Sequence, residues 1–325
     1  MTSKNNFHNI GLIGAGEFGH FATSVIDRLP NFKLVAVADL NEKSALDLAK
    51  KYKAKVYADF NDLLEDQNVE IVMINTPNFL HAKMVIASLK ANKKVLCEKP
   101  MFINNAEKLQ VEKTLKQTEG ILLVNYLLPH AQYYQKIKSF IKEGKYGKIK
   151  YIRIENFATE STIPDGWYWN KKKSGGWFLT ADIHFYDLIN FILNDSAKVV
   201  SAKEFKKNGK TTGIFTSLKS KEVPICIYHD FESGYDRVGF EAKFVFEKAE
   251  VTISGWVPME MIIKDKKTKK YTQNFNREEY YQKLVAENFR KLADLNYRES
   301  QNNFQRVADS SEIALTAQVL SERKK

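Results

Sequence analysis

A glycine motif near the start of the chain constrains the fold more than any other feature. Residues 10–19 read Ile-Gly-Leu-Ile-Gly-Ala-Gly-Glu-Phe-Gly, so a Gly-x-Gly-x-x-Gly pattern follows a short apolar run and opens an amphipathic one. Between a strand and a helix, Gly14 allows a tight turn, Gly16 lets a ligand approach the backbone, and Gly19 lets the helix pack closely. Phosphates bind well at the amino end of such a helix. A glycine-rich turn without a ligand is the structural alternative.

An acidic residue further along favours a dinucleotide. Asp39 ends a second β-branched run twenty residues after Gly19, where a carboxylate accepts hydrogen bonds from the adenosine ribose hydroxyls. Its charge repels a 2′-phosphate, and Leu40 and Asn41 supply no arginine, so we expect NAD in preference to NADP. The residues predicted to contact the cofactor here are Gly14, Ala15, Gly16, Glu17, Phe18, Gly19 and Asp39.

The periodicity of the hydrophobic residues divides the chain into two parts. Up to about residue 126, short apolar runs alternate with helix-length amphipathic segments, which is typical of βαβ units and a parallel, doubly wound sheet. Later the period becomes two, most clearly over residues 240–246, which indicates antiparallel strands. We expect a meandering sheet over about 149–275, interrupted by a helix near 184–193 and followed by two closing helices.

Composition excludes several classes of protein. The 325 residues suffice for two cores of ordinary size, and the apolar runs are too short to cross a bilayer. Lys and Arg number 50 against 39 Asp and Glu, a net charge of +11, but they are dispersed and form no aromatic-interleaved basic stripe. We therefore expect no nucleic-acid partner and no membrane partner.

The cysteine pattern and the amino terminus indicate a reducing compartment. Cys97 and Cys226 form neither a disulfide framework nor a zinc-binding spacing, and the histidines show no ligand spacing, so no metal site is predicted. The first residues lack the apolar segment and cleavage site of a signal peptide. The expected location is the cytoplasm.

Two segments carry candidate catalytic side chains. Lys99, in Cys-Glu-Lys-Pro, follows a predicted strand at the edge where parallel sheets bind ligands, and its bond to Pro100 is a candidate cis peptide. His184 and Asp187 lie on one face of the first turn of a helical stretch, where the helix dipole favours the neutral imidazole that a general base needs. The alternatives are an exposed loop lysine, and a structural histidine with Asp187 as a cap.

An aromatic loop lies before a Gly-Gly pair. Trp167 and Trp169 precede Gly175-Gly176, and aromatic faces bind the apolar C–H surface of sugar rings. The structural alternative is that both tryptophans pin a long loop to its domain.

Four motifs occur in an order that resembles one family. They are Gly14–Gly19, Thr76-Pro77-Asn78 with His81, Glu98-Lys99-Pro100, and Gly175-Gly176 followed by His184-x-x-Asp187-Leu188. The chain resembles the glucose-fructose oxidoreductase / inositol dehydrogenase / MocA (Gfo/Idh/MocA) family of NAD(P)-dependent sugar and polyol dehydrogenases over nearly its whole length.

The resemblance implies a Rossmann domain, residues 1–124, and an α+β domain for substrate binding and oligomerisation, residues 125–325. The second domain has a large, open, mainly antiparallel sheet whose outer face forms subunit contacts, so we expect a homodimer or homotetramer. Lys99 and His184 are the implied catalytic residues, facing the substrate across the nicotinamide. Thr76, Pro77, Asn78, His81, Glu98 and Lys99 join the implied cofactor site. The substrate-binding candidates are Lys99, Trp167, Trp169, Thr180, Asp182 and His184.

The chain departs from the family pattern at three positions. Family members often have Asp four residues before the motif histidine and Gly two before it, where this chain has Thr180 and Asp182. Many also have Arg where this chain has Leu127. Thr180 cannot accept a proton as a carboxylate does, and Leu127 removes a cation, so the sequence leaves open the identity of the substrate and whether Asp182 replaces the family carboxylate.

The predicted function is hydride transfer between NAD(P) and a secondary alcohol or ketone of a sugar, sugar derivative or cyclitol. His184 would take the hydroxyl proton and Lys99 would stabilise charge on the oxygen. Two alternatives remain: a glycosidase that uses NAD for transient oxidation, and a non-catalytic regulator that senses dinucleotide and sugar. The direction of the reaction also stays open.

Overall fold

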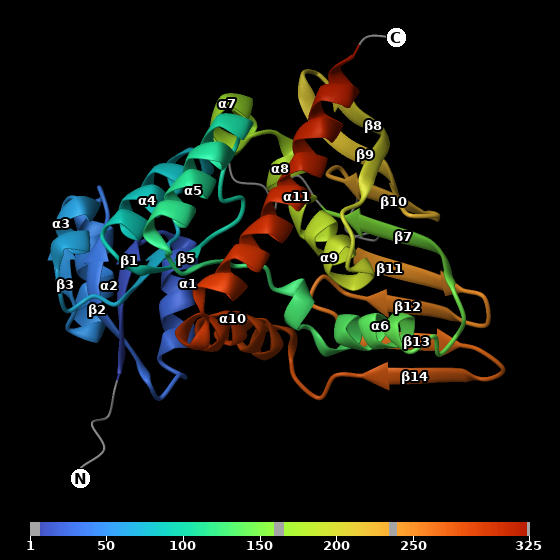
Figure 1. Cartoon of the computed structure of the whole chain (residues 1–325), viewed down its shortest axis with the longest axis horizontal. Coiled ribbons are helices and arrows are strands. Elements are labelled where there is room, and N and C mark those ends of the chain that lie inside the picture. Colours follow the sequence, from blue (N-terminus) through green and yellow to red (C-terminus); the bar gives the residue numbers. More distant parts are fainter. Residues whose placement is uncertain (1–6, 159–165, 234–238, 324–325) are drawn as a thin grey trace. The chain divides into compact units, whose positions relative to one another are not determined.

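A six-stranded parallel sheet organises the first part of the chain. The computed structural model describes residues 7–158, 166–233 and 239–323 (Figure 1). The strand order is β3-β2-β1-β4-β5-β6, so the order reverses between β1 and β4. The strands are β1 (His8–Ile13), β2 (Phe32–Ala38), β3 (Lys55–Tyr57), β4 (Ile71–Ile74), β5 (Lys94–Cys97) and β6 (Leu122–Val124). This confirms the predicted doubly wound α/β fold and creates a ligand-binding crevice at the reversal.

Five helices connect these strands. They are α1 (Glu17–Ile26), α2 (Glu42–Tyr52), α3 (Phe60–Glu65), α4 (Asn78–Lys90) and α5 (Asn105–Thr118). Side-chain caps start several of them: Asn41 accepts from the N–H of Ser44 in α2, and Asn104 accepts from the N–H of Glu107 in α5. Their apolar faces cover strands whose residues are almost entirely buried, as in β4, so the core lies on both sides of this sheet.

Residues 282–305 pack with the first sheet, although the sequence division placed them in the second domain. The compact unit comprises residues 1–126 with 282–305, from α10 (Arg277–Asp294) and α11 (Tyr297–Glu322). Asn288 Nδ2 donates to Asn125 Oδ1 at 2.8 Å, and Ser300 Oγ accepts from the Leu122 N–H at 2.8 Å. Contacts between segments so distant in sequence leave no local signal.

The second unit contains residues 127–281 and 306–325 and is built on an eight-stranded sheet. The order is β14-β13-β12-β11-β7-β10-β9-β8, and only the β7–β10 pair is parallel. The strands are β7 (Ile149–Phe157), β8 (Lys198–Lys207), β9 (Lys210–Ser220), β10 (Val223–Asp230), β11 (Gly239–Phe246), β12 (Glu250–Ser254), β13 (Glu260–Lys264) and β14 (Thr268–Thr272). The expected mainly antiparallel sheet is therefore confirmed.

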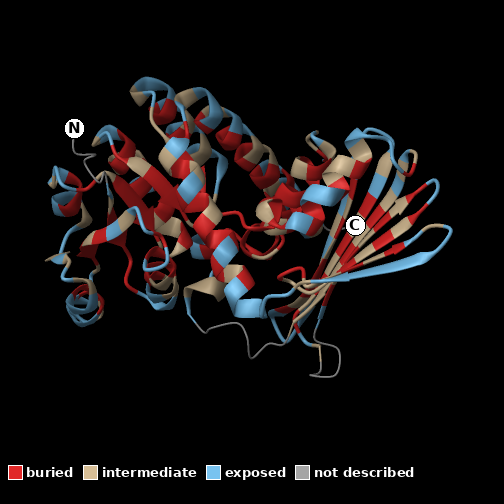
Figure 2. Cartoon of the chain, turned by 90° about the horizontal axis from the view of Figure 1, so that it is seen from below, coloured by how far each residue is buried: buried red, intermediate tan, exposed pale blue. Residues whose placement is uncertain are grey.

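Alternate residues of this sheet are buried, as the period of two predicted. Phe240, Ala242, Phe244 and Phe246 of β11 are each 5% exposed or less. Figure 2 shows the same alternation across the neighbouring strands. The helical elements of this unit are η1 (Leu128–His130), α6 (Gln132–Lys142), η3 (Trp167–Trp169), α7 (Lys171–Ser174), α8 (Trp177–Thr180) and α9 (Ile183–Leu193). Among the described residues, no helix is long and apolar enough to cross a membrane.

Helices α6 and α9 cover the buried face of the sheet. The ring of Tyr134 in α6 meets that of Phe244 in β11, with centroids 6.4 Å apart. In α9, the hydroxyls of Tyr186 and Thr216 lie 2.8 Å apart, which links the helix to β9. One face of the sheet is therefore packed against its own helices, and the opposite face carries half-exposed side chains.

A buried ion pair joins α9 to α11. Arg306 Nε donates to Asp187 Oδ1 at 2.8 Å, and the Asp187 side chain is fully buried while that of Arg306 is 23% exposed. Asp187 therefore helps to hold two helices together, a role that the sequence did not suggest for it. Removing one partner of such a pair leaves an uncompensated buried charge.

We predict that Arg306→Met lowers the free energy of unfolding by about 3 kcal/mol, because the Asp187 carboxylate keeps its burial and loses this partner. Urea unfolding followed by circular dichroism measures the change. The matched control is Arg290→Met, whose exposed ion pair with Glu287 in α10 should contribute less than about 1 kcal/mol. Equal losses in the two variants would contradict the assigned role of the buried pair.

Candidate functional site

The loop between β1 and α1 brings the three motif glycines together. Gly14 has a φ of +99°, and a Cβ atom there would lie 2.7 Å from the carbonyl oxygen of Asn75. A Cβ atom on Gly19 would lie 2.4 Å from the carbonyl oxygen of Gly14, so only glycine lets α1 pack this closely. Gly16 is the N-cap of α1, and a Cβ atom there would meet nothing within 4 Å. The space at the amino end of α1 is therefore open to a phosphate.

Asp39 braces this loop through both carboxylate oxygens. Oδ2 accepts from the N–H of Ala15 at 2.7 Å, and Oδ1 accepts from the N–H of Asn41 at 2.7 Å. Each oxygen keeps lone-pair capacity, so these bonds do not exclude ribose hydroxyls. The neighbouring Leu40 side chain is 94% exposed and presents no positive charge at this edge of the site.

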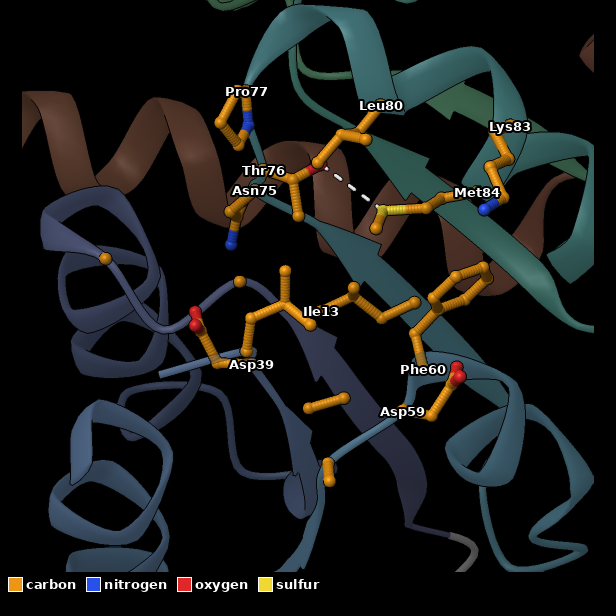
Figure 3. Close-up of a pocket in the computed structure, with 15 residues that line it drawn as sticks. Ile13, Asp39, Asp59, Phe60, Asn75, Thr76, Pro77, Leu80, Lys83 and Met84 are labelled. Atoms are coloured by element: carbon orange, nitrogen blue, oxygen red, sulfur yellow. Dashed lines mark hydrogen bonds between the residues drawn. The ribbon is translucent and has the colours of Figure 1, made fainter. Parts of the chain in front are cut away.

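A cavity of about 390 Å³ lies over the carboxyl ends of β1, β2 and β4 (Figure 3). Phe60 and Met84 lie on one side of it, and Asp39 and Ile13 lie toward the other. Its lining residues are Ile13, Gly14, Gly16, Ala38, Asp39, Leu40, Ala58, Asp59, Phe60, Asn75, Thr76, Pro77, Leu80, Lys83 and Met84. An apolar cleft with a few polar groups at its rim suits an adenine ring and its ribose.

Several lining residues escaped the sequence analysis. The motifs indicated Gly14, Gly16, Asp39, Thr76 and Pro77. They did not indicate the cavity residues of the β3–α3 loop, of the start of α3 or of the first half of α4, including Phe60, Leu80, Lys83 and Met84. The only available signal was position: the β3–α3 and β4–α4 connections begin at the carboxyl ends of strands, where open parallel sheets bind ligands.

Asn75 is a polar group of this cavity that the motifs also missed. Its side-chain oxygen and nitrogen are both buried and have no hydrogen-bond partner among the described residues. A buried amide without partners is costly, so this position fits a ligand with donors and acceptors. Ribose hydroxyls and phosphate oxygens are such groups, and together with the open amino end of α1 they make the residues present here a good fit for NAD.

His81 links the β4–α4 loop to the Glu-Lys-Pro segment. Its ring is 1% exposed, with Nδ1 2.7 Å from the carbonyl oxygen of Pro100 and Nε2 2.6 Å from that of Thr76. Burial lowers the pKa of this imidazole. Asn78, the first residue of α4, is also buried. The hydroxyl of Thr76 donates a hydrogen bond to the Met84 sulfur at 3.3 Å. Direct contact of these residues with a cofactor stays a prediction.

Glu98 and Lys99 follow β5 and share a half-buried environment. Glu98 accepts one hydrogen bond from the side-chain amide of Asn125 and one, at 3.3 Å, from the N–H of Lys99. Burial raises the pKa of Glu98 to about 7, and it lowers the pKa of Lys99 although the nearby Glu98 opposes that shift. The Lys99–Pro100 peptide bond is cis, as the sequence suggested. Burial therefore brings the pKa values of these two groups closer together than those of exposed side chains.

His184 lies half-exposed in the first turn of α9, in the second unit. Its imidazole meets the indole of Trp256 edge-on, with centroids 4.8 Å apart. Trp256 was not among the residues that the sequence singled out. Asp187, which the sequence placed on the same face, accepts a hydrogen bond from Arg306 Nε.

Thr180 and Asp182, which occupy the family's motif positions, are both buried. The Thr180 hydroxyl donates to the carbonyl oxygen of Ser174 at 3.1 Å. Asp182 is fully buried, and its Oδ1 lies 2.9 Å from Nδ1 of His229 in β10. Burial raises the pKa of Asp182, whereas the hydrogen bond from His229 opposes that shift. The Asp182 carboxylate is thus engaged inside the unit, and its contact with a substrate stays a prediction.

The two loop tryptophans have aromatic neighbours of their own. Trp169 packs edge-on against Trp177 with centroids 4.9 Å apart, and Trp167 stacks on Tyr168 at 3.8 Å. The Trp169 contact fits the structural alternative, in which this residue pins the loop. Their predicted contact with a sugar is untested.

The candidate residues thus form two groups. The glycine loop, Asp39, the cavity and the Glu98–Lys99 pair belong to the first unit; Thr180, Asp182, His184 and the tryptophans belong to the second. Within the described ranges, no cluster of three or more His, Cys, Asp or Glu side chains could hold a metal ion.

Comparison with known proteins identifies both parts of the chain. Residues 8–126 match the family described as "Oxidoreductase family, NAD-binding Rossmann fold", and residues 134–222 match the Gfo/Idh/MocA C-terminal domain. Myo-inositol 2-dehydrogenase of Thermotoga maritima is 29% identical over 59% of this chain and 57% of that protein. Inositol 2-dehydrogenase of Salmonella typhimurium is 30% identical over 62% of this chain and 57% of that protein. These alignments span a little over half the length of each relative.

Solved structures extend the similarity of fold to almost the whole chain. A putative myo-inositol dehydrogenase of Sinorhizobium meliloti superposes with a TM-score of 0.80 at 19% identity, covering 98% of both chains. Levoglucosan dehydrogenase, in complex with NADH and levoglucosan, gives a TM-score of 0.80 at 16% identity, covering 95% of this chain and 97% of that one. With two family models matching in the expected order on the expected fold, the chain belongs to the Gfo/Idh/MocA oxidoreductase family.

Proposed function

We propose that the chain is an NAD-dependent dehydrogenase that transfers a hydride between nicotinamide and a secondary alcohol, or the matching ketone, of a sugar, sugar derivative or cyclitol. The observation that carries the proposal is the glycine loop, with the open amino end of α1 and Asp39 hydrogen-bonded to Ala15 beside a 390 Å³ cavity. Membership of the oxidoreductase family supports the reaction type.

The first unit holds the cofactor. The amino end of α1 binds the pyrophosphate, Asp39 accepts hydrogen bonds from the adenosine ribose, and the cavity takes the adenine. Asn75 pairs with polar atoms of the dinucleotide. Bound NAD supplies the hydride acceptor, and the protein supplies orientation and exclusion of water.

Two side chains act on the substrate oxygen. In the oxidation direction the carbinol C–H bond breaks as its electron pair leaves with the hydrogen, and His184 takes the proton of the O–H group. The ammonium group of Lys99 donates a hydrogen bond to the oxygen as negative charge develops there.

Two observations favour a substrate class: the names of the related proteins, and the positions at which this chain differs from the family's motif. The named relatives include two inositol dehydrogenases and a levoglucosan dehydrogenase, so sugars and cyclitols are the first compounds to test. Leu127 and Thr180 stand where the family pattern has an arginine and an aspartate, which favours a neutral polyol over a strongly charged sugar. Trp167, Trp169, Thr180 and Asp182 remain the sequence-based candidates for contacts to it.

Neither alternative function gains support from these observations. The relatives named above are dehydrogenases, which favours net oxidation over a glycosidase that regenerates its NAD. A sensing regulator has no need of a lysine and a histidine at the two motif positions. Net NADH formation with a panel of sugars, inositols and uronic sugars, followed at the nicotinamide absorbance, tests the proposed function and rejects it if no compound is oxidised.

We further propose that the protein is a cytoplasmic homodimer or homotetramer. The support for an oligomer is the face of the eight-stranded sheet opposite α6 and α9, where Tyr228, Val245 and neighbouring side chains are half-exposed. A large open sheet with one uncovered face favours association. The absence of a cysteine framework supports the location.

Light scattering at micromolar concentration should give two or four times the mass of one chain. Tyr228→Asp should shift the population toward the monomer, because it places a charge on the outer face of β10. A monomeric wild-type protein would reject the proposed association.

The wild-type protein should bind NAD more tightly than NADP, because the Asp39 carboxylate repels a 2′-phosphate. Asp39→Asn removes the charge but keeps an acceptor, and should reduce the preference for NAD about tenfold or more. Isothermal titration with each cofactor measures this ratio. Asp47→Asn, the same change on the exposed side of α2, should leave it unchanged; equal ratios in all three proteins would contradict the role of Asp39.

His184→Ala should lower kcat by about a hundred- to ten-thousand-fold and leave the Kd of NAD nearly unchanged, because a general base acts on the proton and not on the cofactor. Lys99→Met should also lower kcat, since an apolar side chain cannot hydrogen-bond the developing alkoxide. Lys90→Met at the exposed end of α4 is the matched control. Wild-type rates in folded His184→Ala and Lys99→Met proteins would show that the active-site assignment is wrong.

A further inference from the structure

Trp256 is held beside His184 by a sharp turn after β12. Gly255 precedes it with a φ of +93°, and a Cβ atom on this glycine would lie 2.7 Å from the carbonyl oxygen of Val257. Only glycine is therefore tolerated in this turn. The same arrangement, a positive-φ glycine before a tryptophan, occurs at Gly166 and Gly176. The turn fixes where the Trp256 indole leaves the backbone.

The indole and the imidazole form an edge-on pair on a buried aromatic base. The ring centroids of Trp256 and His184 are 4.8 Å apart, with an angle of 83° between the planes. Phe185 meets Trp256 at 5.6 Å and Phe240 meets it at 6.1 Å, both also edge-on. Phe185 is fully buried and Phe240 is 5% exposed, whereas His184 and Trp256 are half-exposed. The two phenyl rings thus support a pair whose remaining surface is accessible.

The other tryptophans are engaged differently. The ring of Trp169 is packed against Trp177, and Trp177 is 8% exposed and packs in turn against Phe231. Trp167 stacks on its neighbour Tyr168. The aromatic ring that meets the His184 imidazole in the structure is that of Trp256, a residue outside the loop that the sequence singled out.

We propose that Trp256 binds the apolar C–H face of the sugar or cyclitol and fixes the ring orientation of His184. This inference rests on the proposed function and names the aromatic surface of that site. The half-exposed indole is a flat apolar ring of the kind that packs against axial C–H groups. Its contact with the imidazole limits rotation of the His184 ring, so the basic nitrogen stays directed at one position. Trp256 is accordingly both a substrate-binding residue and a positioning residue.

The orientation of His184 can be tested without a substrate. In full-length protein labelled with ¹³C at histidine Cε1, the His184 signal is assigned from its loss in His184→Gln. Trp256→Leu removes the indole ring current and should shift the His184 signal, and Trp256→Phe should shift it less. The control Tyr271→Leu, an exposed aromatic of β14, should leave it in place. An unmoved His184 signal in both Trp256 variants would overturn the positioning role.

Substrate binding is tested by kinetics with the compound oxidised fastest in a panel that begins with myo-inositol and levoglucosan. Trp256→Leu should raise KM and lower kcat, reducing kcat/KM about tenfold or more, because it removes both stacking and positioning. Trp256→Phe should retain most of the activity, within about threefold. The Kd of NAD should not change in either variant. Wild-type KM and kcat in both variants would overturn the proposal.

The outcomes separate this inference from the proposed function. If no polyol is oxidised and the His184 signal still depends on Trp256, the proposed function is wrong. The result then supports only the contact between the Trp256 and His184 rings. If a polyol is oxidised at wild-type KM and kcat by both variants, the dehydrogenase stands and the role of Trp256 fails. Should Trp256→Leu not fold, an unmoved signal of the labelled histidine in Trp256→Phe would still overturn the contact on which the positioning role depends.

Discussion

The contact between α1 and the end of β1 is the constraint on which the cofactor half of the molecule depends. With a hydrogen atom in place of a side chain at Gly19, the helix lies against the carbonyl of Gly14, and Gly14 in turn lies against Asn75 at the end of β4. This packing sets the amino end of α1 at the reversal of strand order, where the crevice of a doubly wound sheet opens. Asp39 then ties the second strand to the same loop through Ala15.

Patterns within short segments of the sequence predicted the fold and those parts of the site that lie within one segment. The glycine spacing, the position of Asp39 and the period of two over residues 240–246 each report a structure formed by neighbours in sequence. Phe60, Asn75 and Trp256 were missed because their roles arise from chain segments that meet only in the folded protein. The same reason explains why residues 282–305 were assigned to the other domain: their contacts with Leu122 and Asn125 span more than 160 residues.

The second unit differs from the family pattern at the positions of Thr180 and Asp182. Where family members often carry a carboxylate, Thr180 bonds to the backbone of Ser174, and the nearest acidic residue along the chain, Asp182, is buried against His229. The hydroxyl of Thr180 and the carboxylate of Asp182 are therefore both engaged by other groups of the second unit. A half-exposed imidazole and indole, His184 and Trp256, form the surface that we assign to the substrate, and an apolar sugar face fits it better than an anionic group does.

We propose that this chain moves a hydride directly from a polyol carbon to NAD. The most direct measurement uses the polyol that the enzyme oxidises, deuterated at the reacting carbon, followed by mass spectrometry of the dinucleotide. Direct hydride transfer predicts one deuterium in each NADH formed, carried on the nicotinamide ring. NADH without deuterium, or deuterium that returns to the sugar with no net NADH, would contradict it.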